Sequence, residues 1–182
     1  MVAELELQTP YLRLAARVWG PPNGTPVLAL HGWLDNAASF DALARLLPKI
    51  RLVALDLPGH GYSGHRPPGI HYHFVDFIPD VIAAADALGW PRFALLGHSL
   101  GGGIASFVAA TLPERVARLA TIEGFGPPTS NPADSPINLR KALMQMNTLP
   151  GKRLPLYPSR EAAIQAPCEA SGLSWSAATI LV

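Results

Sequence analysis

The sequence predicts an α/β fold in which a mostly parallel sheet is covered by helices on both faces. Two observations support this prediction. Short apolar runs alternate along the chain with longer segments of helical periodicity, an order that gives parallel strands joined by right-handed crossovers. The run at residues 27–30 is apolar at every position, which is typical of a strand buried on both faces of a sheet.

The expected elements follow from periodicity and from the turn-forming residues between them. Strands are expected at residues 12–18, 27–30, 51–55, 93–96 and 116–122. Helices are expected at residues 39–47, with Ser39 as the cap, and at 75–88 and 101–112. Residues 56–69 are rich in glycine and proline and are expected to form a loop. Pro79 marks either the first turn or a kink of its helix.

The character of the chain changes at Gly126. Residues 126–136 are rich in proline, serine and asparagine, and helical patterns follow at 137–147, 160–165 and 174–182. No further strand is evident, and the last pattern continues to Val182 without a capping glycine. The sequence therefore divides into an alternating part, residues 1–125, and a helical part, residues 126–182.

Composition and charge exclude several classes of protein. Of the 182 residues, 49% are hydrophobic and 15% are charged, which indicates a globular chain and not a disordered one. The net charge of +1 predicts no binding to nucleic acid or to an anionic membrane.

Other features of the sequence indicate where in the cell the protein is found. No apolar run is long enough to cross a bilayer, the first residues do not resemble a signal peptide, and the single cysteine, Cys168, forms no intrachain disulfide. We expect a soluble cytoplasmic protein without a metal or other cofactor.

A candidate nucleophile lies between an expected strand and an expected helix. Gly97-His98-Ser99-Leu100-Gly101 matches the G-x-S-x-G pattern of a serine on a sharp strand-to-helix turn. Such a turn strains the backbone and brings residues two before and two after the serine close together, and Gly97 and Gly101 would relieve that crowding. The alternative is a glycine-rich turn whose serine is incidental.

A candidate oxyanion hole comes from two segments. Acyl transfer requires donors for the oxyanion of a tetrahedral intermediate, normally the N–H after the nucleophile and one from the loop after an earlier strand. Leu100 supplies the first. His31-Gly32-Trp33 follows the strand at 27–30, so the N–H of Trp33 is the candidate for the second. The alternative is a glycine turn, at Gly32, with a tryptophan packed into the core.

Three motifs in series resemble the α/β-hydrolase superfamily, and in detail its serine hydrolase-like, esterase-type proteins. They are the two motifs above and, between them, Asp56-Leu57-Pro58-Gly59-His60-Gly61-Tyr62-Ser63. The resemblance implies that Asp56 shapes the floor of the active site without reacting. It also implies an α/β-hydrolase core at 1–125, an incomplete helical cap at 126–182 and absent last strands, so we expect a C-terminally truncated member.

The family's catalytic triad is only partly present. Its order is serine, then an acid, then a histidine. Glu123, at the end of the strand at 116–122, is the candidate acid; the alternative is an acid beyond Val182. All six histidines precede Ser99, so none has the expected place for the base (His31, His60, His65, His71, His73, His98).

The resemblance implies a serine hydrolase that cleaves carboxylic ester or thioester bonds of a small molecule through an acyl-enzyme. Two alternatives stay open: a non-catalytic binding protein or remnant of such an enzyme, and an acyltransferase or thioesterase. We expect the 182-residue chain to be inactive or impaired. We also expect a homo-oligomer or a complementing C-terminal segment, because the shortened sheet would leave a strand edge exposed.

Overall fold

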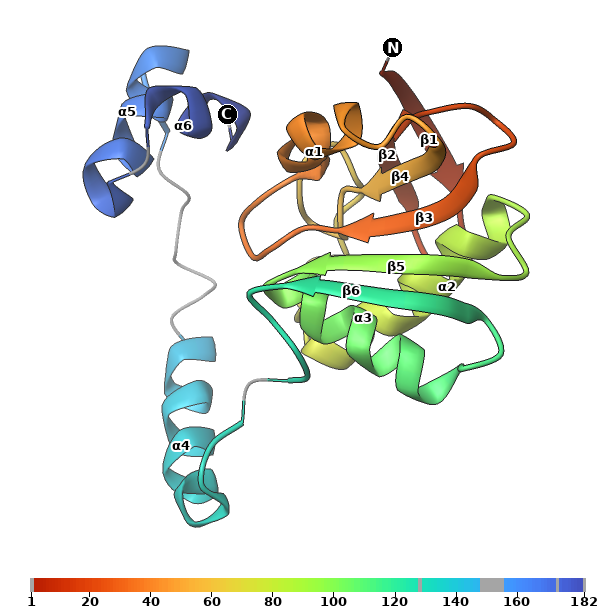
Figure 1. The fold of residues 1–182 in the computed structure, drawn as a ribbon. Coiled ribbons are helices and arrows are strands. Elements are labelled where there is room, and N and C mark those ends of the chain that lie inside the picture. Colours follow the sequence, from red (N-terminus) through yellow and green to blue (C-terminus); the bar gives the residue numbers. More distant parts are fainter. Residues whose placement is uncertain (1, 128, 148–155, 173, 182) are drawn as a thin grey trace. The chain divides into compact units, whose positions relative to one another are not determined.

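The computed structural model describes residues 2–127, 129–147, 156–172 and 174–181 (Figure 1). The chain forms two compact units, which divide between Pro127 and Pro128. The first unit holds the sheet and its helices, and the second holds the C-terminal helices. No helix in the described ranges combines the length and the apolar content needed to span a membrane.

The first unit is built on one six-stranded sheet, which confirms the predicted mostly parallel α/β fold. In space the strands follow the order β1-β2-β4-β3-β5-β6. Strands β4, β3, β5 and β6 run parallel, whereas the β1–β2 and β2–β4 pairs are antiparallel. The bounds are β1 Ala3–Gln8, β2 Arg13–Trp19, β3 Thr25–Leu30, β4 Ile50–Leu55, β5 Phe93–His98 and β6 Val116–Ile122.

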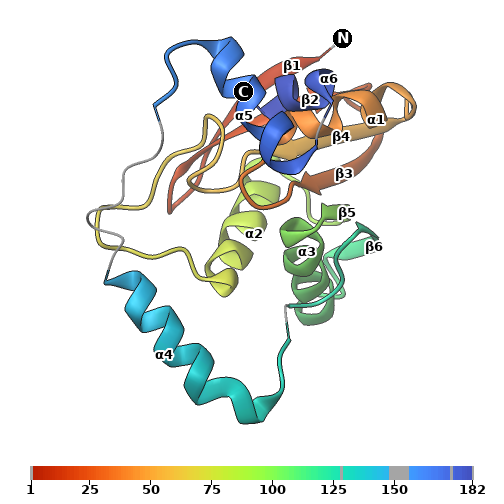
Figure 2. The same cartoon turned by 90° about the vertical axis from the view of Figure 1, so that its left-hand side faces the viewer.

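Helices cover both faces of this sheet, as the alternating pattern predicts. Helices α2 (Phe77–Ala87) and α3 (Leu100–Thr111) lie on one face, and the 3-10 helix η1 (Ala37–Phe40) with α1 (Asp41–Arg45) lies on the other (Figure 1, Figure 2). Within β3, Leu28 and Leu30 are buried among residues of α2 and α3, whereas Val27 and Ala29 are buried among those of η1 and α1. Both faces of β3 are therefore core, which explains its continuous apolar run.

Two details of the first unit differ from the sequence prediction, and a third decides between two predicted alternatives. Strand β1 was not expected, although Glu4, Leu5, Glu6 and Leu7 alternate as a half-buried strand does. The cap at Ser39 is wrong: the Asn36 side chain accepts from the Ala38 N–H at 2.9 Å and begins η1. Ser39 instead donates its hydroxyl to Asp35. Pro79 lies in the first turn of α2, where its missing N–H has no helical acceptor.

The second unit contains η3 (Pro132–Asp134), α4 (Ser135–Met146), α5 (Arg160–Ser171) and α6 (Trp175–Leu181). Helix α5 is longer than predicted, because it continues through Pro167 to Ser171. The next residue, Gly172, caps the helix with a φ of 66°. Gly172 is the type of residue that adopts this left-handed cap readily. The predicted helical pattern at 174–182 ends at Val182, which lies outside the described residues. The assignment of this unit as a cap stays a prediction.

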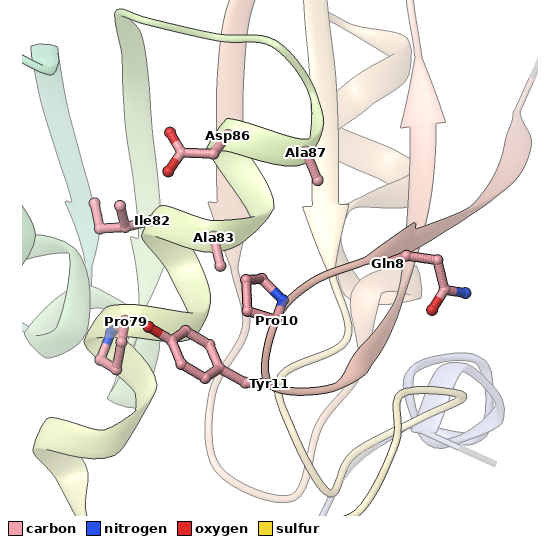
Figure 3. A pocket seen from close by; sticks show the side chains of 8 residues that line it. All are labelled: Gln8, Pro10, Tyr11, Pro79, Ile82, Ala83, Asp86 and Ala87. Atoms are coloured by element: carbon pink, nitrogen blue, oxygen red, sulfur yellow. The ribbon is translucent and has the colours of Figure 1, made fainter.

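A groove of about 340 Å³ lies between the β1–β2 turn and α2 (Figure 3). Pro10 and Tyr11 form one side, and Pro79 and Ala83 form the other. None of the candidate site residues lines it.

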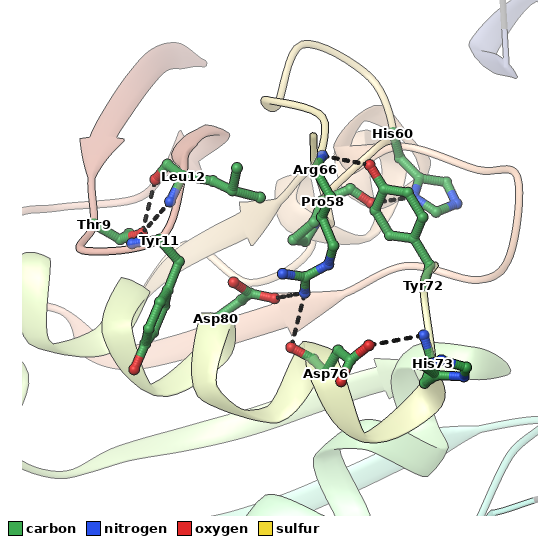
Figure 4. Close-up of polar contacts among 10 residues, drawn as sticks. All are labelled: Thr9, Tyr11, Leu12, Pro58, His60, Arg66, Tyr72, His73, Asp76 and Asp80. Carbon is green, nitrogen blue, oxygen red and sulfur yellow. Dashed lines mark hydrogen bonds and ion pairs between the residues drawn. The ribbon is translucent and has the colours of Figure 1, made fainter. Parts of the chain in front are cut away.

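A buried ion pair holds the long loop after β4 to helix α2 (Figure 4). The Arg66 guanidinium donates to Asp80 Oδ2 at 2.6 Å and to the Asp76 carbonyl at 2.9 Å. The Arg66 N–H also donates to the Tyr72 hydroxyl at 2.7 Å. Burial raises the pKa of the Asp80 carboxyl, and the neighbouring Arg66 opposes that rise. Asp80 Oδ1 and Arg66 Nε have no hydrogen-bond partner, so the pair is only partly satisfied.

This geometry predicts opposite effects for single and double substitutions. Asp80→Ala should lower the free energy of unfolding by about 3–5 kcal/mol, because it leaves the Arg66 charge buried and unpaired. The double variant Arg66→Met, Asp80→Leu should recover most of that loss. Urea unfolding followed by tryptophan fluorescence measures both, and a double variant as unstable as the single one would contradict the explanation.

Candidate active site

The candidate residues lie where the strand order of the sheet reverses. From β3 the chain crosses to β4 on one side and then returns to β5 on the other. In open α/β sheets, the carboxyl ends of strands at such a reversal leave a crevice where ligands bind. Trp33 follows β3, Ser99 follows β5, and Glu123 follows β6, the other neighbour of β5. The structure therefore places the sequence-predicted residues on three adjacent strand ends.

Ser99 occupies a strained turn between β5 and α3. Its φ is 49° and its ψ is −113°, and its side chain is exposed. Few residues other than glycine adopt such angles, and they cost about 1–3 kcal/mol. The Ser99 N–H donates to the Ile122 carbonyl of β6 at 2.9 Å, and its carbonyl accepts from the Gly103 N–H at 3.1 Å. The main chain is therefore fixed on both sides of the serine.

The flanking glycines make this turn possible. A Cβ at Gly97 would lie 2.3 Å from the Gly101 carbonyl oxygen, and a Cβ at Gly101 would lie 2.1 Å from the Leu30 carbonyl oxygen. Both distances are far inside van der Waals contact. The loop after β6 is equally close, because a Cβ at Gly124 would lie 2.9 Å from Ser99 Cα.

The loop after β3 approaches the serine from the other side. A Cβ at Gly32 would lie 3.5 Å from Ser99 Cβ, and the Gly101 N–H donates to the His31 carbonyl at 3.1 Å. Trp33 follows directly, with 58% of its surface exposed. Within the described residues, the backbone hydrogen bonds include none from the N–H of Trp33 or of Leu100. Leu100 is the first residue of α3, where N–H groups have no helical acceptor.

His31 fixes this loop from inside the protein. The residue is completely buried; its Nδ1 lies 2.7 Å from the Gly32 carbonyl, and its Nε2 accepts from the Leu57 N–H at 2.9 Å. Since a carbonyl only accepts, Nδ1 carries the proton and the ring is neutral. Burial lowers the pKa of His31 to about 4, against a smaller opposing contribution from the Gly32 carbonyl. Sequence reasoning gave this histidine no role.

Asp56 fixes the loops after β3 and β4 together. Its Oδ1 accepts from the Ala37 N–H and its Oδ2 from the Tyr62 N–H, both at 2.8 Å. Gly61 has a φ of 49°, and a Cβ there would lie 2.2 Å from the Asp56 carboxylate. Asp56 is itself buried. The carboxylate thus organises main-chain groups, which is the structural role that the resemblance implied.

His98, the residue before the serine, lies between two carboxylates. The His98 Nε2 lies 3.9 Å from Glu123 Oε2, and its Nδ1 lies 4.0 Å from Asp35 Oδ2. The Glu123 side chain is 84% exposed, and its φ is 51°. His98 therefore stands between carboxylates from the loops after β3 and β6. Sequence reasoning did not predict that Asp35 would lie beside His98.

His60 lies in the interior, beneath the Trp33 ring. It is 9% exposed, its Nδ1 lies 3.1 Å from the Pro58 carbonyl, and its ring centroid is 5.3 Å from that of Trp33 (Figure 4 shows the Pro58 contact). The described residues contain no group of three or more histidine, cysteine, aspartate or glutamate side chains suited to hold a metal ion.

The burial of His31 predicts a loss of stability in mild acid. The unfolded chain binds a proton at this residue near pH 6.5, but the folded chain does not until about pH 4. Stability is therefore complete above pH 6.5 and falls by about 1.4 kcal/mol per pH unit below it. His31→Gln should remove this slope between pH 6.5 and 5, measured by urea unfolding. His65→Gln, at an exposed position, should retain it; equal slopes for wild type and His31→Gln would contradict the assignment.

Comparison with known proteins agrees with this architecture. A family model described as the alpha/beta hydrolase fold matches residues 25–156. The chain is 42% identical over 142 residues to the "Serine hydrolase-like protein" of Danio rerio. The matched segment is 78% of this chain and 44% of that protein. The chain is 44% identical over 124 residues to the Homo sapiens protein of the same name, covering 68% and 61% respectively. The chain spans about half the length of these curated relatives.

Solved structures show the same similarity. A hypothetical protein from Pseudomonas aeruginosa PAO1 superposes with a TM-score of 0.92 at 46% identity, covering 98% of this chain and 64% of that one. The thioesterase domain from the curacin biosynthetic pathway gives a TM-score of 0.84 at 25% identity, covering 100% and 66%. Because the family model matches well over half of the residues and the sheet has the corresponding order, this chain belongs to the α/β-hydrolase fold family.

Proposed function

We propose that this chain carries the nucleophilic half of a serine hydrolase, which cleaves carboxylic ester or thioester bonds through an acyl-enzyme at Ser99. The observation that carries the proposal is the exposed, strained serine at the reversal of strand order, flanked by Leu100 and by the Gly32–Trp33 loop. In the described part of the chain, the backbone hydrogen bonds include none from the N–H groups of Leu100 and Trp33. Strain of this kind is found where function requires it. The names of the serine hydrolase-like relatives are consistent with this activity.

The mechanism follows from the groups present. Ser99 Oγ attacks the carbonyl carbon of the substrate, and the negative charge that develops on the carbonyl oxygen is stabilised by the N–H groups of Leu100 and Trp33. The intermediate then expels an alcohol or thiol and leaves an acyl-serine, which water hydrolyses. The positive end of the α3 dipole lies at the same point and favours the oxyanion.

The proton of Ser99 needs a base, and all six histidines precede Ser99, contrary to the order of the family's triad. Three of them, in the strands and loops around the site, are poorly suited to this role. His31 is buried and holds a main-chain N–H, His60 faces a carbonyl, and His98 lies between two carboxylates. We therefore propose that the base comes from outside these 182 residues, in keeping with the greater length of the relatives. Glu123 is the proposed acid that would orient it.

Two alternatives remain distinguishable. The solved thioesterase domain favours a thioester substrate, and an acyltransferase would share every step up to the acyl-serine. A non-catalytic binding protein would keep the fold without using Ser99. Ester turnover that disappears in Ser99→Ala, measured in a form of the protein that includes a base, would exclude this last possibility.

The nucleophile is tested by covalent labelling. A fluorophosphonate should modify Ser99 in a form of the protein that includes a base. Ser99→Ala should abolish labelling, because no other serine among the described residues has a positive φ at a strand-to-helix turn. Intact-mass and peptide mass spectrometry locate the adduct. Thr111→Ala is the control and should label normally, since Thr111 is the last residue of α3 and donates its hydroxyl to the Phe107 carbonyl. Absence of any adduct on Ser99 in that form would overturn the proposal.

The acid is tested by an isosteric substitution. Glu123→Gln should lower kcat by about 10⁴-fold in that same form, because an amide cannot stabilise the protonated base. Glu114→Gln, at an exposed position, is the matched control and should leave kcat unchanged. A loss of less than about tenfold at Glu123 would assign the acid to another residue.

A further inference from the structure

Large apolar side chains are exposed on the two loops that flank Ser99. The loop after β3 carries Trp33 and Leu34, which are 58% and 71% exposed, and the loop after β6 carries Phe125, which is 80% exposed. These loops belong to β3 and β6, the two strands that pair with β5. We call Trp33, Leu34 and Phe125 the apolar rim.

Leu34 is the most informative member of the apolar rim. Its φ is 58°, a left-handed conformation that is a genuine outlier for a bulky residue. Its side chain is mostly in solvent, so no burial compensates for this conformation. Folding alone would favour asparagine or glycine at this position. An observed outlier of this kind supports a functional role.

Phe125 is held close to the serine by its neighbours. A Cβ at Gly124 would lie 2.3 Å from the Ser99 carbonyl oxygen, and the Gly126 N–H donates to Ser106 Oγ at 3.2 Å. The main chain on both sides of Phe125 therefore runs along the first turns of α3. The main chain that carries Phe125 is therefore close to Ser99, and the Phe125 side chain is exposed.

The charges around Ser99 restrict which group this rim accepts. Glu123 and Asp35 lie on either side of His98, so carboxylates stand on the same two loops as the apolar residues. A substrate with a negative charge near its acyl group would be repelled by them. A neutral hydrocarbon chain would gain contact with Trp33, Leu34 and Phe125 at no such cost.

We propose that the apolar rim binds a neutral alkyl chain on the acyl side of the substrate, and that Leu34 determines the preferred chain length. This inference rests on the function proposed above, because it places the chain beside Ser99. It identifies the substrates as medium-chain acyl esters or thioesters, in preference to acetyl or dicarboxylic compounds.

Two ketones test the inference without requiring catalysis. Binding of 2-decanone and 2-butanone to the 182-residue chain is measured by titration calorimetry, in wild type and in Ser99→Ala. 2-Decanone should bind about 60-fold more tightly, since each methylene group that becomes buried adds about fourfold and we expect three to be buried. Equal affinities for the two ketones would overturn the proposal.

The matched variants are Leu34→Asn and Leu46→Asn. Leu46 is also exposed, at 76%, but has an ordinary φ of −86°. Leu34→Asn should weaken 2-decanone binding at least fourfold while its thermal midpoint stays the same or rises, because asparagine tolerates the left-handed conformation. Leu46→Asn should leave 2-decanone binding unchanged. A clear loss of stability in Leu34→Asn, or equal binding losses in both variants, would show that Leu34 serves only the fold.

The ketone-binding test of the apolar rim and the labelling test of the proposed hydrolase function can fail independently. If Ser99 fails to react with a fluorophosphonate but the chain-length preference for ketones persists, the hydrolase proposal fails and the apolar rim stands as a binding site. If Ser99 reacts but 2-decanone gains nothing over 2-butanone, only the apolar rim is overturned.

Discussion

The structure around the candidate site depends on one close approach of main chains. Ser99 has a left-handed backbone, and only the missing side chains of Gly97 and Gly101 allow the turn to fit against itself and against the end of β3. The hydrogen bond from the Ser99 N–H to Ile122 fixes this turn to β6. Since no side chain intervenes at this contact, the serine hydroxyl and the N-terminus of α3 are placed by backbone geometry.

Two buried polar side chains complete this arrangement from beneath. The His31 ring links the loop after β3 to the Leu57 N–H, and the Asp56 carboxylate links Ala37 to Tyr62. Each satisfies main-chain donors that would otherwise be buried without partners, and such an unpaired group costs about 1–3 kcal/mol. The loop that carries Trp33 and Leu34 is therefore fixed at its base and exposed at its tip, a combination suited to ligand binding.

Much of the fold could be predicted from the sequence because buried parallel strands are continuous apolar runs. Strands β3, β4 and β5 followed from such runs, whereas β1 was missed because its alternating glutamates and leucines form a half-exposed edge. Around the site, the tight turns at Gly97–Gly101 and at Gly32 could be predicted because glycine spacing reflects backbone geometry. The left-handed conformations of Leu34 and Glu123 were not, since neither residue type signals a positive φ. The neutral state of His31 depends on burial, which no short motif reveals.

The glycines that admit the turn also affect how the chain reaches its native state. Helix α3 begins with Leu100 followed by Gly101, Gly102 and Gly103, and each glycine lowers helix propensity by about 1 kcal/mol relative to alanine. The first turn of α3 therefore has little helical stability of its own and depends on packing against the sheet and the loop after β6. We expect the strained geometry of Ser99 to form late in folding, so that incompletely folded molecules present an ordinary serine.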